Sequence, residues 1–405
     1  MPDRPDQPGD PAINLISGEF WGRDPHAELR WLRANAPVYR DERAGVWGIS
    51  KHADVKRLSR MPEVFSSAQG IRPDSGPLPM MIDMDDPAHK TRRKLVSGGF
   101  TPRRVAAQED YLRRVCDEII DGVCERGACD FVTEIAAPLP LIVIGDALGF
   151  APQDRKLLLT WSDDMVRALT GGDDPGLLVK AAAAFTGFTD CAGQAIAERR
   201  GAARDDLLSL LVHAEVDGDR LDHDSLVQES LLILIGGDET TRHVISGGMY
   251  QLARHPEQRR ALIEDPGRIP VAVEEMLRWV SPIKNMNRTA VRDFELRGQR
   301  IREGDKVLLL YPSANRDEEV FADPFRFDIG RSPNDHLAFG NGPHFCLGSN
   351  LARLELKVMF ERLLARLPDI EPAEEGEPAH RPANFVSGYE SFRVRFTPSP
   401  RLGHA

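Results

Sequence analysis

One cysteine lies in a loop of unusual composition. The segment Phe339-Gly340-Asn341-Gly342-Pro343-His344-Phe345-Cys346-Leu347-Gly348 places two glycines and a proline before the thiol of Cys346, and a helical run begins near Asn350. Glycine and proline restrict a loop to particular backbone shapes. A helix N-terminus lowers the pKa of a nearby thiol, and the thiolate is the form that binds metals. The loop therefore predicts a fixed thiolate ligand.

A second segment, Gly236-Gly237-Asp238-Glu239-Thr240-Thr241, lies within a long helical pattern. Two glycines inside a helix cost about 1 kcal/mol each relative to alanine, so their presence requires a reason. Glycine allows another group to approach the backbone closely. The Thr240 hydroxyl can bond back to the Gly236 carbonyl and loosen the helix there. An acid beside an alcohol, Glu239 next to Thr240, is a suitable proton relay.

The helix that carries this second segment is predicted from its ends. Asp222 can cap its start, and His255 with Pro256 stops it after Arg254. Such a helix is about 50 Å long at 1.5 Å per residue, enough to cross the whole molecule. Its middle, Leu231 to Ile235, is apolar all round, which predicts burial.

The rest of the chain favours a mainly α fold with a small β-rich portion. Apolar residues recur at helical spacing from Pro87 to Lys180 and over much of residues 205–365. Short strands are predicted at Val38 to Tyr39, Val46 to Ile49, Asp293 to Leu296, Lys306 to Leu310 and Phe392 to Phe396. Since no repeat or linker divides the chain, we expect one domain over residues 13–397, with flexible tails at 1–12 and 398–405.

Composition and charge exclude several function classes. The 405 residues carry a formal charge of −11, which argues against a nucleic-acid partner. No apolar run is long enough to span a bilayer, and the Pro- and Asp-rich start is unlike a signal peptide. The five cysteines are an odd number without paired metal spacing, which favours thiols in a reducing compartment. We therefore expect a cytoplasmic protein.

The cysteine loop resembles the haem-binding loop of cytochrome P450 enzymes, and the glycine-rich hexapeptide resembles their oxygen-side helix. The resemblance runs from about Ile16 to Pro400, although many family members have alanine at the position of Gly236. It implies the P450 fold and haem b (iron protoporphyrin IX), with Cys346 as the iron ligand. Thiolate ligation favours O–O cleavage. The resemblance further assigns proton delivery to Glu239 and Thr240.

The resemblance also implies a cradle for the cofactor. Haem propionates need cations or hydrogen-bond donors, and His89 and Arg93 share one helix face because they lie four residues apart. The implied haem contacts are His89, Arg93, Gly237, Arg288, Phe339, His344, Cys346 and Gly348. A buried structural ion network behind the haem is implied for Glu275, Arg278 and Arg326.

The electron source must be another protein, because the sequence has no dinucleotide-binding loop and no cysteine cluster for an iron–sulfur centre. A ferredoxin, served by a ferredoxin reductase, is the expected donor to a monomeric enzyme. We expect the ferredoxin to dock on the cysteine side, at a basic patch of Lys90, Arg92, Lys94, Arg353 and Lys357.

Several segments resemble actinobacterial steroid monooxygenases that oxidise the terminal C26/27 methyl of cholesterol or cholest-4-en-3-one. These segments span residues 71–74, 79–87, 282–286 and 381–388. An apolar pocket suits a large, weakly polar ligand, and methionines adapt to irregular shapes. The predicted lining is Ile71, Leu78, Met80, Met81, Leu234, Val280, Ile283, Phe385 and Val386.

Two alternatives remain open from the sequence. The same enzyme class could act on a fatty acid, a terpene or a polyketide, and pocket length above the iron would discriminate these. A haem-binding sensor or carrier without turnover is the other alternative. The acid and alcohol pair speaks against a carrier, because a carrier needs no proton delivery.

Overall fold

The long helix α11, His223–Arg254, forms the centre of the computed structural model, which describes residues 13–170 and 174–403. Asp222 caps this helix, since its side chain accepts a hydrogen bond from the Ser225 N–H at 2.7 Å. The helix ends at Arg254, and Pro256 begins the next helix. Both predicted ends are confirmed. Within the apolar middle, Leu231, Ile233 and Leu234 are buried, whereas Leu232 and Ile235 are partly exposed.

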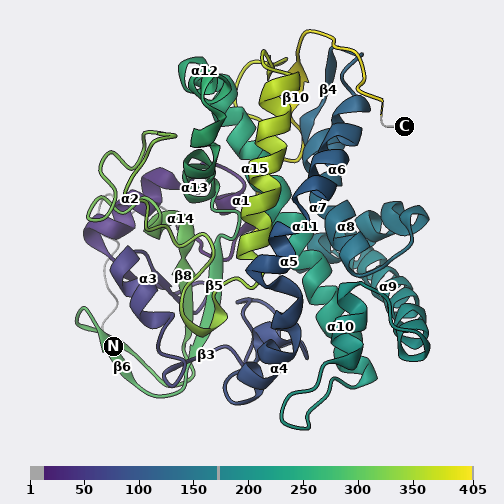
Figure 1. Cartoon of the computed structure of the whole chain (residues 1–405). Coiled ribbons are helices and arrows are strands. Elements are labelled where there is room, and N and C mark those ends of the chain that lie inside the picture. Colours follow the sequence, from purple (N-terminus) through teal and green to yellow (C-terminus); the bar gives the residue numbers. More distant parts are fainter. Residues whose placement is uncertain (1–12, 171–173, 404–405) are drawn as a thin grey trace.

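Helices surround α11 on several sides (Figure 1). Helices α8, α9 and α10 lie on one side of it, while α2, α3 and α14 lie with the main sheet on the other. Helices α7, α13 and α15 pack directly against it. The helices are α1 Gly18–Trp21, α2 His26–Asn35, α3 His52–Leu58, α4 Ala88–Ser97, α5 Pro102–Ala106, α6 Glu109–Asp121, α7 Pro138–Ala147, α8 Arg155–Thr170, α9 Pro175–Gly201, α10 Leu207–His213, α12 Pro256–Glu264, α13 Ile269–Val280, α14 Tyr311–Ala314 and α15 Ser349–Arg366.

The main sheet has five strands in the order β1-β2-β8-β5-β3. Its strands are β1 Val38–Asp41, β2 Val46–Ile49, β3 Phe65–Ser66, β5 Asn285–Ala290 and β8 Lys306–Leu310. Strands β2 and β8 pair in parallel, and the other neighbours are antiparallel. Every residue of β2 is buried, which explains why its sequence is a continuous apolar run.

Two smaller sheets complete the β portion. A three-stranded sheet joins β4 Ala128–Asp130, β10 Arg393–Arg395 and β9 Glu371–Pro372, and a hairpin joins β6 Phe294–Leu296 to β7 Gln299–Ile301. The five predicted strands all occur, with shifted ends in three of them. The strands β3, β4, β5, β7 and β9 were not predicted, because most are very short and β5 is polar. Strands β3, β4, β5 and β9 exist through pairing with segments further along the chain, whereas β7 pairs with its neighbour β6.

The C-terminal segment stays close to the body of the fold. The Ser399 N–H donates to the Cys124 carbonyl at 2.9 Å, and the Leu402 N–H donates to Asp121 at 3.1 Å. The described part of the predicted C-terminal tail is therefore bound to the end of α6 and the turn after it, while the predicted tail 1–12 lies outside the described residues. Within residues 13–170 and 174–403, no helix has both the length and the hydropathy needed to cross a membrane.

Candidate active site

The Cys346 loop is held in a tight curl. Gly340 and Gly342 have φ values of +69° and +75°, in the left-handed region that favours glycine. A side chain at Gly342 would also meet the Ser59 carbonyl oxygen at 2.2 Å. The Cys346 N–H donates to the Phe339 carbonyl at 2.9 Å, and α15 begins at Ser349. The loop glycines thus fix the thiol just before a helix, as the sequence predicts.

The acidity of the Cys346 thiol differs from expectation. Burial raises its pKa above the ordinary value, and this effect exceeds the lowering by the Gly348 N–H, Arg93 and Arg353. The helix N-terminus therefore lowers the pKa of the Cys346 thiol as predicted, but burial raises this pKa by more. A thiolate at this place requires a cation beside it, such as a metal ion, because a buried anion is otherwise costly.

An internal cavity lies between the Cys346 loop and α11. Its walls come from α4, α7, α11, the start of α15, strand β5 and the segment around Met81. The predicted residues that line it are Ile71, Met81, His89, Arg93, Gly237, Thr240, Ile283, Arg288, Phe339, His344, Cys346 and Gly348. All the predicted haem contacts thus meet at one cavity.

Basic and imidazole groups gather on one side of this cavity. Arg288 is 4% exposed, and among the described residues no carboxylate forms an ion pair with it. Its side chain donates a hydrogen bond to the Asn287 carbonyl at 2.8 Å. The rings of His89 and His344 lie 4.1 Å apart, and burial lowers the pKa of His344 to about 3. Arg93 donates to the Phe345 carbonyl at 2.6 Å.

These groups fit an anionic ligand that completes the cavity. A buried guanidinium without a carboxylate partner is unfavourable, and burial lowers the pKa of Arg288 accordingly. Carboxylates of a bound cofactor beside Arg288 and Arg93 would supply the missing charge. A metal at the centre of that cofactor would face the Cys346 thiol. The donor set therefore matches a porphyrin with two propionates and an iron that takes a thiolate.

On the opposite wall, α11 presents its glycine face. The Thr240 hydroxyl donates to the Gly236 carbonyl at 3.0 Å, which confirms the predicted back-bond. A side-chain carbon added at Gly236 would meet nothing within 4 Å, so the helix is open there toward the cavity. Thr240 therefore lies where a small molecule bound between α11 and the cysteine could reach its hydroxyl.

Glu239 faces away from the cavity, although the sequence predicts that it forms a proton relay with Thr240. Its side chain is 1% exposed and lies between Arg242, which donates to one carboxylate oxygen, and Arg381, whose Nη1 donates to the other at 3.0 Å. Burial alone would raise its pKa, but Arg242, His243 and Arg381 together hold it below the ordinary value. Its helical neighbours Gly236, Gly237 and Thr240 line the cavity, whereas Glu239 does not.

The arginines around Glu239 lead toward the surface. Arg242 also contacts Asp163 at 2.8 Å, and Arg381 lies 3.6 Å from Glu390. Asp163 and Glu390 are 30% and 38% exposed. A chain of ionic groups therefore connects the buried acid with solvent.

Comparison with known proteins identifies the family. A family model described as "Cytochrome P450" matches residues 179–394. The "Steroid C26-monooxygenase" of Mycobacterium tuberculosis is 53% identical over 398 residues, covering 97% of this chain and 99% of that protein. The chain belongs to the cytochrome P450 family.

Other relatives of this P450 are more distant. The "Methyl-branched lipid omega-hydroxylase" of Mycobacterium bovis is 41% identical and covers 95% of each chain. A solved structure of a Mycobacterium marinum cytochrome P450 in complex with pseudoionone has a TM-score of 0.88 at 36% identity, covering 95% of this chain and 99% of that one. The P450 fold is thus confirmed, and the protein is a haem-thiolate monooxygenase.

The apolar wall of this P450 differs from the predicted lining. Ile71, Met81 and Ile283 line the cavity, but the other six predicted residues are not among its described lining residues. Leu78 is 36% exposed. The remaining five pack elsewhere: Met80 and Leu234 in the core beside α8 to α10, Val280 against Gly247, Phe385 near Arg72, and Val386 in a bridge to Ile283.

Several lining residues were missed. On α11, Ile233 lines the cavity instead of Leu234, because positions 233, 237, 240 and 244 share one helix face. Helical periodicity from Thr240 could have found it. Glu355, on α15, also lines the cavity, and burial raises its pKa to about 8. The other apolar lining residues that were not predicted include Ile82, Phe100, Ile144, Leu232, Val244, Leu277 and Met286.

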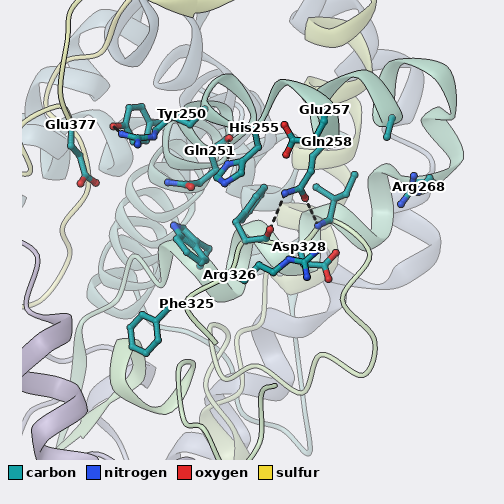
Figure 2. A pocket seen from close by; sticks show the side chains of 15 residues that line it. Tyr250, Gln251, His255, Glu257, Gln258, Arg268, Phe325, Arg326, Asp328 and Glu377 are labelled. Atoms are coloured by element: carbon teal, nitrogen blue, oxygen red, sulfur yellow. Dashed lines mark hydrogen bonds between the residues drawn. The ribbon is translucent and has the colours of Figure 1, made fainter. Parts of the chain in front are cut away.

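The buried ion network behind the cysteine loop uses a different arginine from the one predicted. Glu275 is paired with Arg278 at 2.7 Å, as expected, but its second partner is Arg331 at 3.1 Å. Arg326 is exposed and lines a separate open cleft near the end of α11 (Figure 2). Only its backbone carbonyl joins the network, by accepting from Arg331 at 3.0 Å.

Most cations of the predicted ferredoxin patch already have acidic partners. Arg92 contacts Glu229, Arg353 is paired with Glu274, and Lys357 is paired with Glu109 and Glu361. Lys94 lies 3.6 Å from Asp217, and both side chains are more than half exposed. No ion pair involves Lys90 among the described residues. The positive charge of this patch is thus weaker than the sequence implied.

Proposed function

We propose that this P450 hydroxylates the terminal methyl group of the side chain of cholesterol or cholest-4-en-3-one. The observation that carries the proposal is the 53% identity, over nearly the whole chain, to a steroid C26-monooxygenase. The apolar cavity wall, which includes Ile71, Met81 and Ile283, supports a large, weakly polar substrate. One oxygen atom would enter a carbon–hydrogen bond and the other would become water.

In this proposal the cofactor is haem b, held by the cavity residues described above. Cys346 would bind the iron, and Arg288, Arg93, His89 and His344 would bind the propionates. The haem supplies the capacity to activate dioxygen and to accept electrons one at a time. The protein supplies the binding, the orientation and the charges around it.

Thr240 and Glu239 would then deliver protons to the oxygen side of the cavity. The Thr240 hydroxyl can pass a proton because it both donates and accepts. Since its arginine partners keep Glu239 ionised at neutral pH, the acid would accept a proton from the surface side and pass it on rather than store it. A movement of its side chain or an intervening water is needed, because it faces away from the cavity.

Electrons would come from a ferredoxin and its reductase, docked near Lys90 and Lys94 on a monomeric enzyme. A reducing, cytoplasmic location is supported by the five cysteines, none of which forms a disulfide.

The first test is an optical titration of the purified ferric protein. Addition of cholest-4-en-3-one should produce a tight low-to-high-spin change, whereas a long-chain fatty acid of matched length should not. The reduced carbon monoxide spectrum should show the red-shifted thiolate band in the same preparation. A normal band without a steroid response would reject the steroid while leaving the enzyme class.

A second candidate substrate is a methyl-branched fatty acid or similar lipid. The 41% identity to a methyl-branched lipid omega-hydroxylase favours it over terpenes and polyketides. A non-catalytic haem carrier is set aside, because the chain belongs to a monooxygenase family. A spin change with a methyl-branched acid, but not with the steroid, would select this candidate.

A further inference from the structure

A buried acid on α11, Glu229, lies outside the machinery described so far. It precedes Ile233 by four residues, Gly236 by seven and Thr240 by eleven, so it continues the cavity face of the helix. Its side chain is fully buried. An acid at such a place requires partners, because a buried carboxylate without them is costly.

Glu229 joins three walls of the cavity. Its Oε1 atom accepts a hydrogen bond from the Met81 N–H at 2.8 Å and lies 3.4 Å from Nη1 of Arg92. Met81 belongs to the short turn Met81–Asp83, and Arg92 belongs to α4, which also carries His89 and Arg93. The second oxygen, Oε2, is buried without a hydrogen-bond partner.

The turn held by Glu229 forms part of the substrate side of the cavity. The side chains of Met81 and Ile82 both line it. The other end of the same segment is fixed by Asp83, whose carboxylate accepts from the Ile71 and Leu78 N–H groups, both at 2.8 Å. Among the described residues, the bond from the Met81 N–H to Glu229 is therefore the one hydrogen bond between this turn and α11.

We propose that Glu229 is a positioning residue that holds the Met81–Asp83 turn against α11, and that its charge controls how tightly this wall of the cavity is held. The proposal rests on the monooxygenase site but not on the steroid assignment. In the ionised state, Glu229 makes a charge-assisted bond to Met81 and an ion pair with Arg92. The buried charge is nevertheless costly, so the neutral acid favours the held turn, and loss of the proton favours a released turn in which water reaches Glu229.

The environment of Glu229 places this change near neutral pH. Burial raises its pKa to about 7, while the Met81 N–H and Arg92 act in the opposite direction. Arg92 is the one charged side chain that acts on it among the described residues. The acid is therefore mostly neutral below about pH 7 and mostly ionised above it. Because the held turn raises this pKa relative to a solvated carboxyl group, proton loss favours release, so the turn is held more firmly at about pH 6 than at about pH 8.

The test compares the wild-type holoprotein with Glu229→Gln and Arg92→Met. Glutamine keeps the acceptor for the Met81 N–H but cannot ionise. Removal of Arg92 keeps the acid and takes away the cation that lowers its pKa. The first readout is the amide-exchange protection factor of residues 78–84 in ligand-free protein between pH 6 and 8, with the haem content measured alongside. The second is the dissociation constant for cholest-4-en-3-one over the same range.

We expect the protection factor and the affinity of the wild type to fall by up to about tenfold from pH 6 to pH 8, because the held turn binds one proton more tightly than the released turn does. Glu229→Gln should stay at the wild-type pH 6 level throughout. Arg92→Met should keep a transition but at higher pH. Other titrating groups of the cavity, such as Glu355, remain in all three proteins and affect them alike.

Equal pH profiles of residues 78–84 in the wild type and Glu229→Gln would overturn the proposal. A merely structural role would lower stability in Glu229→Gln without removing the pH dependence, and this outcome would overturn it too. If cholest-4-en-3-one gives no spin change with any of the proteins, the steroid assignment fails. The exchange measurement then still decides the role of Glu229, because it needs no ligand.

Discussion

Replacing Arg331 by methionine should destabilise the protein strongly, whereas the same change at Arg326 should have almost no effect. The Arg331 side chain is 9% exposed, and its partner Glu275 is fully buried. Arg331 also donates to the carbonyls of Ala322 at 2.6 Å and Asp323 at 3.2 Å. Arg326 is exposed, and no ion pair involves it among the described residues.

The size of the effect follows from these contacts. Removing one partner of a buried ion pair costs about 3–5 kcal/mol, and we take the lower end because Arg278 still neutralises Glu275. At about 2.1 cal/mol/K per residue, 405 residues have an unfolding entropy of about 0.85 kcal/mol/K. A loss of about 3 kcal/mol therefore lowers the melting temperature by about 3.5 °C. An exposed substitution such as Arg326→Met stays within about 0.5 kcal/mol, or less than 1 °C.

The assay follows helix content by circular dichroism and the thiolate band of the carbon monoxide complex in the same heating series. Both signals should fall earlier in Arg331→Met than in Arg326→Met and the wild type. If Arg326→Met lowered the melting temperature as much as Arg331→Met, the assignment of Arg331 as the second partner of Glu275 would be refuted.

Three further predictions concern the active site and its donor. Thr240→Ala should lower the product formed per oxygen consumed by about 10²-fold or more, the lower range for a lost proton-transfer group, while Thr240→Ser should keep the wild-type ratio. Assays of product and of peroxide measure this ratio. An unchanged ratio in Thr240→Ala would reject the relay. Arg288→Met should lose haem during gel filtration more readily than the wild type, because the propionate side loses its most buried cation; equal haem retention would contradict that role. Charge reversal at Lys94 should weaken ferredoxin affinity by a few fold at low salt and less at high salt. Lys357→Glu should change the affinity less, because Lys357 already has acidic partners. Ferredoxin binding that is insensitive to Lys94 and to salt would reject the docking face.

The sequence determined the features that depend on neighbouring residues along the chain. The caps and the stop of α11, the back-bond from Thr240 to Gly236 and the curl of the Cys346 loop all follow from local geometry. The cavity face of α11 belongs to this class as well, because helical periodicity from Thr240 gives Ile233, whereas the predicted lining named Leu234. These features need no knowledge of distant segments, because each is fixed within a few residues.

The tertiary structure decided every feature that depends on which distant groups meet. Strand β5 is polar and becomes a strand through its pairing with β8 and β3. Arg331 rather than Arg326 reaches Glu275 because the chain turns between them, and sequence spacing cannot give that turn.

Charge and burial were decided in the same way. Burial raises the pKa of Cys346 against the helix effect, and Arg381, far along the chain, holds Glu239 away from the cavity. The residues therefore determine which chemical groups are available, and packing determines their environment. Desolvation and ion pairing depend on all groups within a few ångströms, and most of these come from remote parts of the sequence.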